Sequence, residues 1–204
     1  MIKTALITGI IMMLFMISGC SGNLNPRISQ PGTDIQNNGN VDENKNPTPA
    51  VVRPRSLGGI CLGDSIEDVV KILGKDYKES LETDDSGYFK EDLTVWTYDK
   101  GITVKFGKET EKVISVTSFS PDFETDLGVR VEDSAKTGFE KYKPKSDQVT
   151  SRHTGEPLEG WFDIGEEKLI ILDFDKGNNT KVNSIVEDSS IIEEIVLAYW
   201  DHFD

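Results

Sequence analysis

A short amphipathic helix with its own start and stop signals, inside Leu62–Lys75, most constrains how this chain can fold. Asp64 or Ser65 can cap its first turn, and each is followed three residues later by a carboxylate, as in a capping box. Gly74 supplies the left-handed residue that often ends a helix. Its apolar residues share one helical face, and they are Ile66, Val69, Val70 and Leu73. The sequence therefore predicts a helix that packs on the strand-like residues that follow it.

The pattern around this helix recurs later in the chain. Leu62-Gly63 reappears 65 residues further on as Leu127-Gly128, and Trp96 reappears as Trp161 at the same offset. Glu67-Asp68 corresponds to Glu132-Asp133, and Lys112–Val116 corresponds to Lys181–Ile185 after a small insertion. Separated matches in one order indicate a tandem duplication, with repeats at about 57–120 and 121–187.

Each repeat is expected to hold a helical segment followed by a meander of antiparallel strands. Alternating apolar and polar residues predict half-buried strands. In the first repeat these are 96–98, 101–106 and 113–119, and in the second they are 161–164, 168–174 and 182–187. The helix of the second repeat is degenerate, so its packing should be thinner. Leu169 and Ile171 make the second face of their strand apolar too, so something should cover that face or bind there.

The last residues of the chain also read as a helix. Ser190 and Glu193 have capping-box spacing, and apolar residues at helical spacing follow as far as Phe203. We expect a C-terminal helix at 189–203 that packs on the sheet, or, less favoured because its polar positions are acidic, one that lies on a membrane surface. The predicted fold class is thus α+β: a tandem repeat of a helical segment plus an antiparallel β-meander, with a C-terminal helix, over 56–204.

The N-terminus indicates export and a lipid anchor. Lys3 precedes the apolar run 5–17, which is too short for a permanent membrane span and suits the core of a signal peptide. The run ends in Ile17-Ser18-Gly19-Cys20, which resembles the lipobox of bacterial lipoproteins. The resemblance implies a signal peptide at 1–19, lipidation of Cys20, as with palmitate, and a bacterial membrane-anchored protein that faces the extracytoplasmic side. An ordinary secretory peptide with an incidental cysteine is the alternative.

Residues 20–55 differ in composition from the rest of the chain. They are rich in asparagine and proline and contain no aromatic residue, so they cannot bury enough apolar surface to offset their chain entropy. We interpret them as a disordered tether with a reach of about 33 Å. The formal net charge of −14 argues against nucleic acid as a partner.

Few residues in the sequence fit a catalytic or metal-binding pattern. If Cys20 is lipidated, Cys61 is the only remaining thiol, either a small buried hydrophobe or a reactive group. His153 and His202 belong to no metal-binding pattern, and the stretch Asp173–Asn178 fits a hairpin turn better than a calcium loop. We therefore expect no catalytic residue, no metal site and no cofactor.

The residues named so far resemble a superfamily of small secreted modules: the β-lactamase-inhibitor-like repeats and the small outer-membrane lipoproteins of the barrel-assembly machinery. The resemblance rests on Leu62–Ser65, Val69, Ile72–Gly74, Trp96–Tyr98 and the strands after them. In tandem inhibitors of this kind, two sheets form a concave surface that grips an enzyme. The resemblance therefore implies a binding surface at Trp96, Tyr98, Lys105, Trp161 and Ile171, although both tryptophans could instead be core residues.

Two classes of function follow from these observations. The first is a lipid-anchored extracytoplasmic interaction module that binds a protein or another envelope component through its sheet face, with an enzyme inhibitor or an assembly factor as special cases. The second is an envelope hydrolase that acts through carboxylates, which would need a cleft with two acids about 5 to 10 Å apart. A solute receptor with two lobes usually needs a longer chain.

Overall fold

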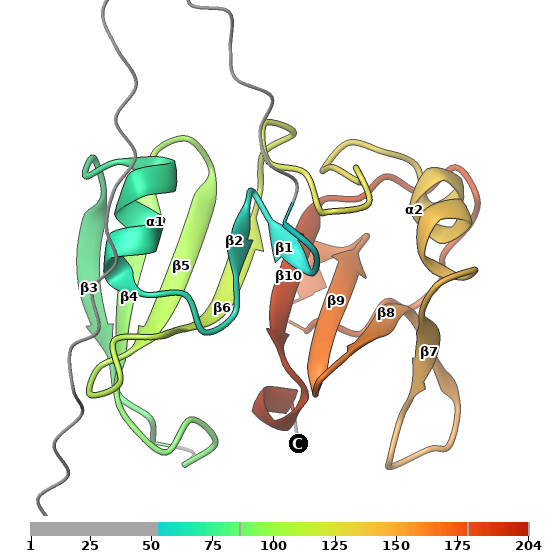
Figure 1. Ribbon diagram of the computed structural model, residues 1–204. Helices are drawn as coiled ribbons and strands as arrows, with labels where there is room; N and C mark the ends of the chain where they lie inside the picture. Colours follow the sequence, from blue (N-terminus) through green and yellow to red (C-terminus); the bar gives the residue numbers. More distant parts are fainter. Residues whose placement is uncertain (1–52, 86, 179, 204) are drawn as a thin grey trace, which may run out of the picture. The chain divides into compact units, whose positions relative to one another are not determined.

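The computed structural model describes residues 53–85, 87–178 and 180–203 (Figure 1). In this part of the chain, an eight-stranded antiparallel sheet is accompanied by a two-stranded sheet and two α-helices. The strands of the small sheet are β1 (Ser56–Leu57) and β2 (Ile60–Cys61). The strands of the large sheet are β3 (Lys78–Glu82), β4 (Leu93–Tyr98), β5 (Ile102–Gly107), β6 (Val113–Ser118), β7 (Asp147–Thr150), β8 (Pro157–Gly165), β9 (Lys168–Asp173) and β10 (Glu194–Tyr199).

The large sheet is continuous, and its strand order is β3-β4-β5-β6-β10-β9-β8-β7. The last strand in the sequence, β10, lies between β6 and β9 and pairs antiparallel with both (Figure 1). Thr117 of β6 lies opposite Val196, which in turn lies opposite Ile171 of β9. β10 therefore joins the strands β3–β6 and the strands β7–β9 into one hydrogen-bonded sheet.

The helix α1 (Ile66–Leu73) confirms the helix predicted from the sequence. The Ser65 hydroxyl caps it by accepting a hydrogen bond from the backbone N–H of Asp68 at 3.3 Å. At the other end Gly74 has φ +84° and donates its N–H to the carbonyl of Val70, which ends the helix. Val69 and Leu73 are buried against the sheet.

The second helix, α2 (Ala135–Tyr142), is capped by Ser134 and is less amphipathic in sequence than α1. Gly138 permits close approach to the sheet, because a Cβ atom there would lie 2.6 Å from Cδ1 of Leu172. The ring of Tyr142 stacks on Phe162 of β8 with a centroid distance of 5.2 Å. Neither helix in the described ranges is long and apolar enough to span a membrane.

The tandem helix-plus-meander repeat with a C-terminal helix is wrong as a description of the fold. The eight strands make one sheet, and residues 194–199 form its strand β10, followed by the 3-10 turn η2 (Trp200–Phe203). Five of the six β10 residues are buried, on both faces of the sheet. A strand buried on both faces is a continuous apolar run, and such a run satisfies helical spacing equally well.

The strand expected at 182–187 is also wrong. Residues 182–187 form no β-strand, and β10 lies beside β6 instead. The segment is held instead by Asn183, whose side chain donates to the carbonyls of Glu159 and Leu172 and accepts from the N–H of Phe174. The match between 112–116 and 181–185 is therefore not a structural correspondence.

The sheet has apolar clusters on both faces. The helix face, which α1, α2 and the small sheet cover, includes Tyr98, Phe106, Phe162 and Leu197. On the far face a smaller cluster consists of Val149, Trp161, Leu169, Ile171, Val196 and Ala198. Trp200 packs against this cluster, and Phe203 lies 5.0 Å from Trp161 between ring centroids. The prediction that the second apolar face needs a cover is confirmed, and η2 provides it.

Replacing Leu197 tests the central position of β10. Because Leu197 is fully buried, Leu197→Ala should lower the free energy of unfolding by about 2–5 kcal/mol. Ile185→Ala removes a side chain of the same size from a residue that is 84% exposed, and should change it by less than about 0.5 kcal/mol. Urea unfolding of the two variants measures the difference, and equal effects would contradict the placement of β10.

Candidate functional site

Two of the predicted binding residues, Trp96 and Tyr98, are buried on the helix face. Trp96 stacks on Tyr77 with a centroid distance of 3.8 Å and donates its Nε1–H to Glu79 at 2.8 Å. The Tyr98 hydroxyl donates to the carbonyl of Gly74 at 3.2 Å, and burial raises the pKa of Tyr98 to about 12. Both side chains fasten α1 and its following turn to the sheet.

The other three predicted binding residues lie on the far face. Ile171 is fully buried, and Trp161 is buried with its Nε1–H donated to the carbonyl of Lys181 at 2.6 Å. Lys105 is partly exposed and pairs with Glu82 at 2.7 Å. The five residues therefore occupy both faces and do not form one surface. Cys20, the predicted lipidation site, lies outside the described residues.

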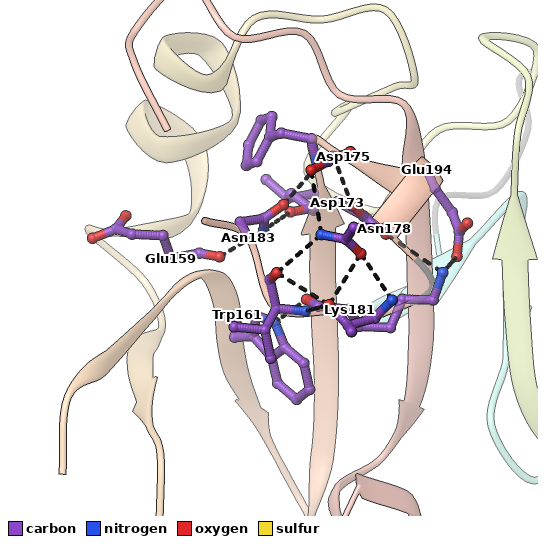
Figure 2. A network of polar contacts seen from close by, with 12 residues as sticks. Glu159, Trp161, Asp173, Asp175, Asn178, Lys181, Asn183 and Glu194 are labelled. Carbon is purple, nitrogen blue, oxygen red and sulfur yellow. Dashed lines mark hydrogen bonds and ion pairs between the residues drawn. The ribbon is translucent and has the colours of Figure 1, made fainter. Parts of the chain in front are cut away.

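A buried ionic network occupies one end of the far face (Figure 2). Asp173 and Glu194 lie opposite each other on β9 and β10, and their side chains are only 1% and 5% exposed. Lys181 places its Nζ 2.5 Å from Glu194 and 3.4 Å from Asp173 (Figure 2). Burial raises the pKa of Glu194, against the opposing effect of the Lys181 hydrogen bond.

The same network shows how the predicted hairpin-turn region is organised. Asp175 accepts a hydrogen bond from Asn178, which also donates to the carbonyl of Val182 (Figure 2). The ammonium group of Lys181 bridges the two buried carboxylates. In the described part of the chain there is no group of three or more His, Cys, Asp or Glu side chains that could hold a metal ion.

A cavity of about 480 Å³ lies between the C-terminal end of α1, the small sheet and the loop after β6. Its apolar wall is formed by Ile72, Leu73 and Phe123. Gly58 and Gly59 line it with positive φ angles, and a Cβ atom on Gly58 would lie 3.0 Å from the Phe123 ring. Ile72 is 41% exposed, so the apolar wall is open to solvent. We call this hollow the α1 cavity.

Hydrogen bonds and ion pairs hold the α1 cavity in shape. Arg53 forms a bidentate pair with Asp64, with N–O distances of 2.5 and 2.7 Å, and this raises the pKa of Arg53. Leu57 and Thr125 form a bridge between the small sheet and the loop after β6. The cavity lining also includes three acidic residues, Asp122, Glu124 and Asp126. The cavity is thus an apolar hollow with an acidic rim.

Most of the polar groups around the α1 cavity already have partners within the protein. Asp126 accepts the N–H of Arg55 at 2.8 Å, and Glu124 pairs with Arg130 at 2.5 Å. Arg53 is held by Asp64 as described. Few polar groups therefore converge on the hollow itself.

A second cavity, of about 360 Å³, lies on the far face near η2. Three acids contribute to its lining, Asp147, Asp163 and Glu167, and all three residues are exposed. Trp200 lines the cavity too, and the guanidinium of Arg152 lies 4.8 Å from its ring centroid. Carboxylates and an aromatic ring therefore share this hollow.

The cysteine and the histidine of the described core are not poised for chemistry. Cys61 is partly buried, and burial raises the pKa of its thiol, which disfavours the reactive thiolate. His202 lies between Phe89 and Tyr199, with ring-centroid distances of 4.5 and 5.6 Å. Burial lowers its pKa, so the imidazole is neutral at pH 7. His153 is exposed in the loop between β7 and β8.

No protein-family model matches the chain, and no curated protein matches it. The structure is similar, with a TM-score of 0.45 and 12% sequence identity, to the 1.5 Å crystal structure of an extracellular protein containing an SCP domain from Bacillus anthracis str. Ames. The match covers 82% of this chain and 50% of that protein, so the chain spans about half of its length.

Sequence reasoning did not find the α1 cavity. Its walls come from residues 53–59, 72–73 and 122–126. Backbone hydrogen bonds from Gly58 to Glu124 and from Asp126 to Ser56 bring the first and the last of these segments together. The one local signal was the Gly58-Gly59 pair, which joins β1 to β2 and is typical of a close backbone approach. The aromatic residues that the sequence did single out serve the core instead.

The pH dependence of stability tests the buried network. Because burial raises the pKa of Glu194 above its ordinary 4.5, its contribution to stability is fully present below that value and is lost as pH rises through the raised pKa. Glu194→Gln replaces the carboxyl group with an amide that does not ionise, so the variant does not lose stability in this way. Its free energy of unfolding relative to that of the wild type should therefore increase from about pH 4 to about pH 7. Urea midpoints across that range measure the effect. The exposed Glu187→Gln is the control, and a parallel response of both variants would contradict the account.

Proposed function

We propose that this protein is a lipid-anchored, extracytoplasmic interaction module that receives an apolar side chain of a partner protein in the α1 cavity. The observation that supports the proposal is an open apolar wall, Ile72 with Leu73 and Phe123, inside a rim of acidic residues. Solvent-exposed apolar surface with a polar rim is typical of protein interaction sites.

The size and lining of the α1 cavity support a side-chain anchor. Interfaces draw most of their affinity from a few large side chains that fill pockets, surrounded by polar contacts. Burying one large apolar side chain contributes about 1.5–3 kcal/mol. Asp122, which is exposed at the rim, favours a partner with a basic residue beside its apolar anchor.

A protein partner suits this cavity better than a small ligand does. The volume of about 480 Å³ is within the range of small-molecule sites. Such sites, however, orient their ligands with a few convergent polar groups, and here Arg53, Glu124 and Asp126 are engaged within the protein. The sequence had suggested Trp96 and Trp161 as binding residues, but both are buried, so the proposed binding surface is the α1 cavity instead.

The alternative class, a carboxylate-dependent envelope hydrolase, has one observation in its favour, the acidic cavity near Trp200. A glycosidase needs one carboxyl group that stays protonated at its working pH, usually through a desolvated setting. Asp147, Asp163 and Glu167 are exposed, and the two buried carboxylates, Asp173 and Glu194, are occupied by Lys181. The geometry therefore favours binding over hydrolysis.

Anchoring through Cys20 has a direct test. Cells that express Cys20→Ser should incorporate no labelled palmitate into this chain, whereas Cys61→Ser should retain the label, because only Cys20 follows a lipobox. Labelled palmitate followed by gel autoradiography measures this. Label in the Cys20→Ser chain would refute the anchor.

A charge placed in the α1 cavity tests the interaction. Ile72→Lys should reduce partner recovery about tenfold, which corresponds to about 1.4 kcal/mol, because it places a charge in the solvent-exposed part of the apolar wall. Ile191→Lys is the matched control, since Ile191 is 48% exposed and lies outside the cavity lining. Affinity purification of the tagged full chain from membranes, quantified by mass spectrometry, measures recovery.

Two results would refute the proposed site. One is an unchanged set of recovered proteins with Ile72→Lys; the other is an equal loss with Ile191→Lys. Equal urea midpoints for the two variants show that differences in recovery do not arise from misfolding.

A further inference from the structure

The strand β3 is an accessible edge of the large sheet (Figure 1). Its five residues, Lys78–Glu82, are all exposed, and within the described residues it pairs with β4 alone. The pairing with β4 is regular over all five residues, without a bulge. Its outer side therefore presents a straight row of backbone N–H and C=O groups that a further strand could meet.

The other edge of the sheet is different. The register of β7 with β8 shifts between Gln148 and Thr150, so this edge is irregular. Bulges and short irregular strands are a common means of preventing edge-to-edge pairing. The irregularity of β7 and the regularity of β3 distinguish the two edges, and only β3 has the geometry of a pairing strand.

We propose that β3 pairs antiparallel with β3 of a second copy of this chain, around a two-fold axis at Ser80. In this register Ser80 lies opposite the Ser80 of the other copy, and Lys78 lies opposite Glu82. The same pair of charges then forms twice, once at each end of the strand. An interface with two-fold symmetry requires this self-complementarity.

The charges of β3 favour this arrangement. Charged residues protect an edge when the approaching strand brings a charge of the same sign. The sequence Lys-Glu-Ser-Leu-Glu meets itself in reverse without placing like charges directly opposite each other. The existing pairs of Lys78 with Asp99 and of Glu82 with Lys105 lie at the surface, so they compete only weakly with the new contacts.

An exposed apolar side chain supports the same register. Leu81 is 67% exposed although it lies in a strand of the sheet. In the proposed pairing the two Leu81 residues are diagonal neighbours across the axis, on the helix face of the sheet. Diagonal neighbours lie within about 7–8 Å, which is within reach of long side chains. The second copy would thus cover Leu81.

Cysteine cross-linking on intact membranes tests the pairing. In the full chain with Cys61→Ser, Ser80→Cys should give a covalent dimer on mild oxidation, because opposed residues of an antiparallel pair have Cα atoms at about 4.5–5.5 Å. Thr150→Cys on β7 is the control for random collision and should give at least about tenfold less dimer. The Cys61→Ser chain alone measures any contribution of Cys20.

A charge exchange between copies tests the register. Lys78→Glu alone and Glu82→Lys alone should each suppress the Ser80→Cys cross-link, because like charges then meet at both ends. Co-expression of the two variants with tags of different size should restore it as a heterodimer. In that pair the two acidic side chains of one copy face the two basic side chains of the other. Ser80→Cys with Leu81→Glu should also cross-link poorly.

The proposal would be overturned by equal dimer from Ser80→Cys and Thr150→Cys, or by cross-linking that neither Leu81→Glu nor the single charge changes reduce. Failure of the mixed variants to recover the heterodimer would overturn the Ser80-centred register. Circular dichroism of each variant shows that the monomer is folded, so that a lost cross-link reports on pairing.

Discussion

The structure depends on the pairing of β6 with β10. This pair joins the strands before residue 120 to the strands after residue 146, and it is the only ladder between the two groups among the described residues. Ile195 and Leu197 contribute to the core beneath the helices, while Val196 and Ala198 belong to the far-face cluster. Because one strand serves both clusters, the two layers are stabilised together. The cavity beside α1 and the edge at β3 are both positioned by this sheet.

Local signals in the sequence were sufficient where a structure is determined locally. Ser65 and Gly74 delimit α1 through contacts within a few residues, so the helix was predictable. The alternation of Ile102, Val104 and Phe106 likewise identified β5, which has one well-buried face. β10 was misread because a central strand has two apolar faces and no alternation. Nothing within residues 194–199 specifies that β6 will lie alongside.

The candidate sites were also difficult to predict from local sequence patterns. Trp96, Tyr98 and Trp161 stand out in the sequence as large aromatic residues, yet such residues also build a core. Trp96 and Tyr98 hold α1 and its following turn to the sheet, and Trp161 belongs to the far-face cluster. The α1 cavity has no such signal, because it arises where Gly58 and Gly59 meet residues 122–126. Such a hollow is a property of tertiary packing. The resemblance to inhibitor modules directed attention to the sheet face, whereas the accessible apolar surface lies beside it.

The position of β10 also has a consequence for the order in which this chain can fold. The strand at the centre of the sheet follows all seven other strands of that sheet in the sequence, and its contacts with β6 span about 80 residues. Long-range strand pairing of this kind slows folding. A growing polypeptide cannot close its central ladder before residues 194–199 have emerged. Until then the sheet lacks the strand that joins its two halves, and β6 and β9 both remain open edges.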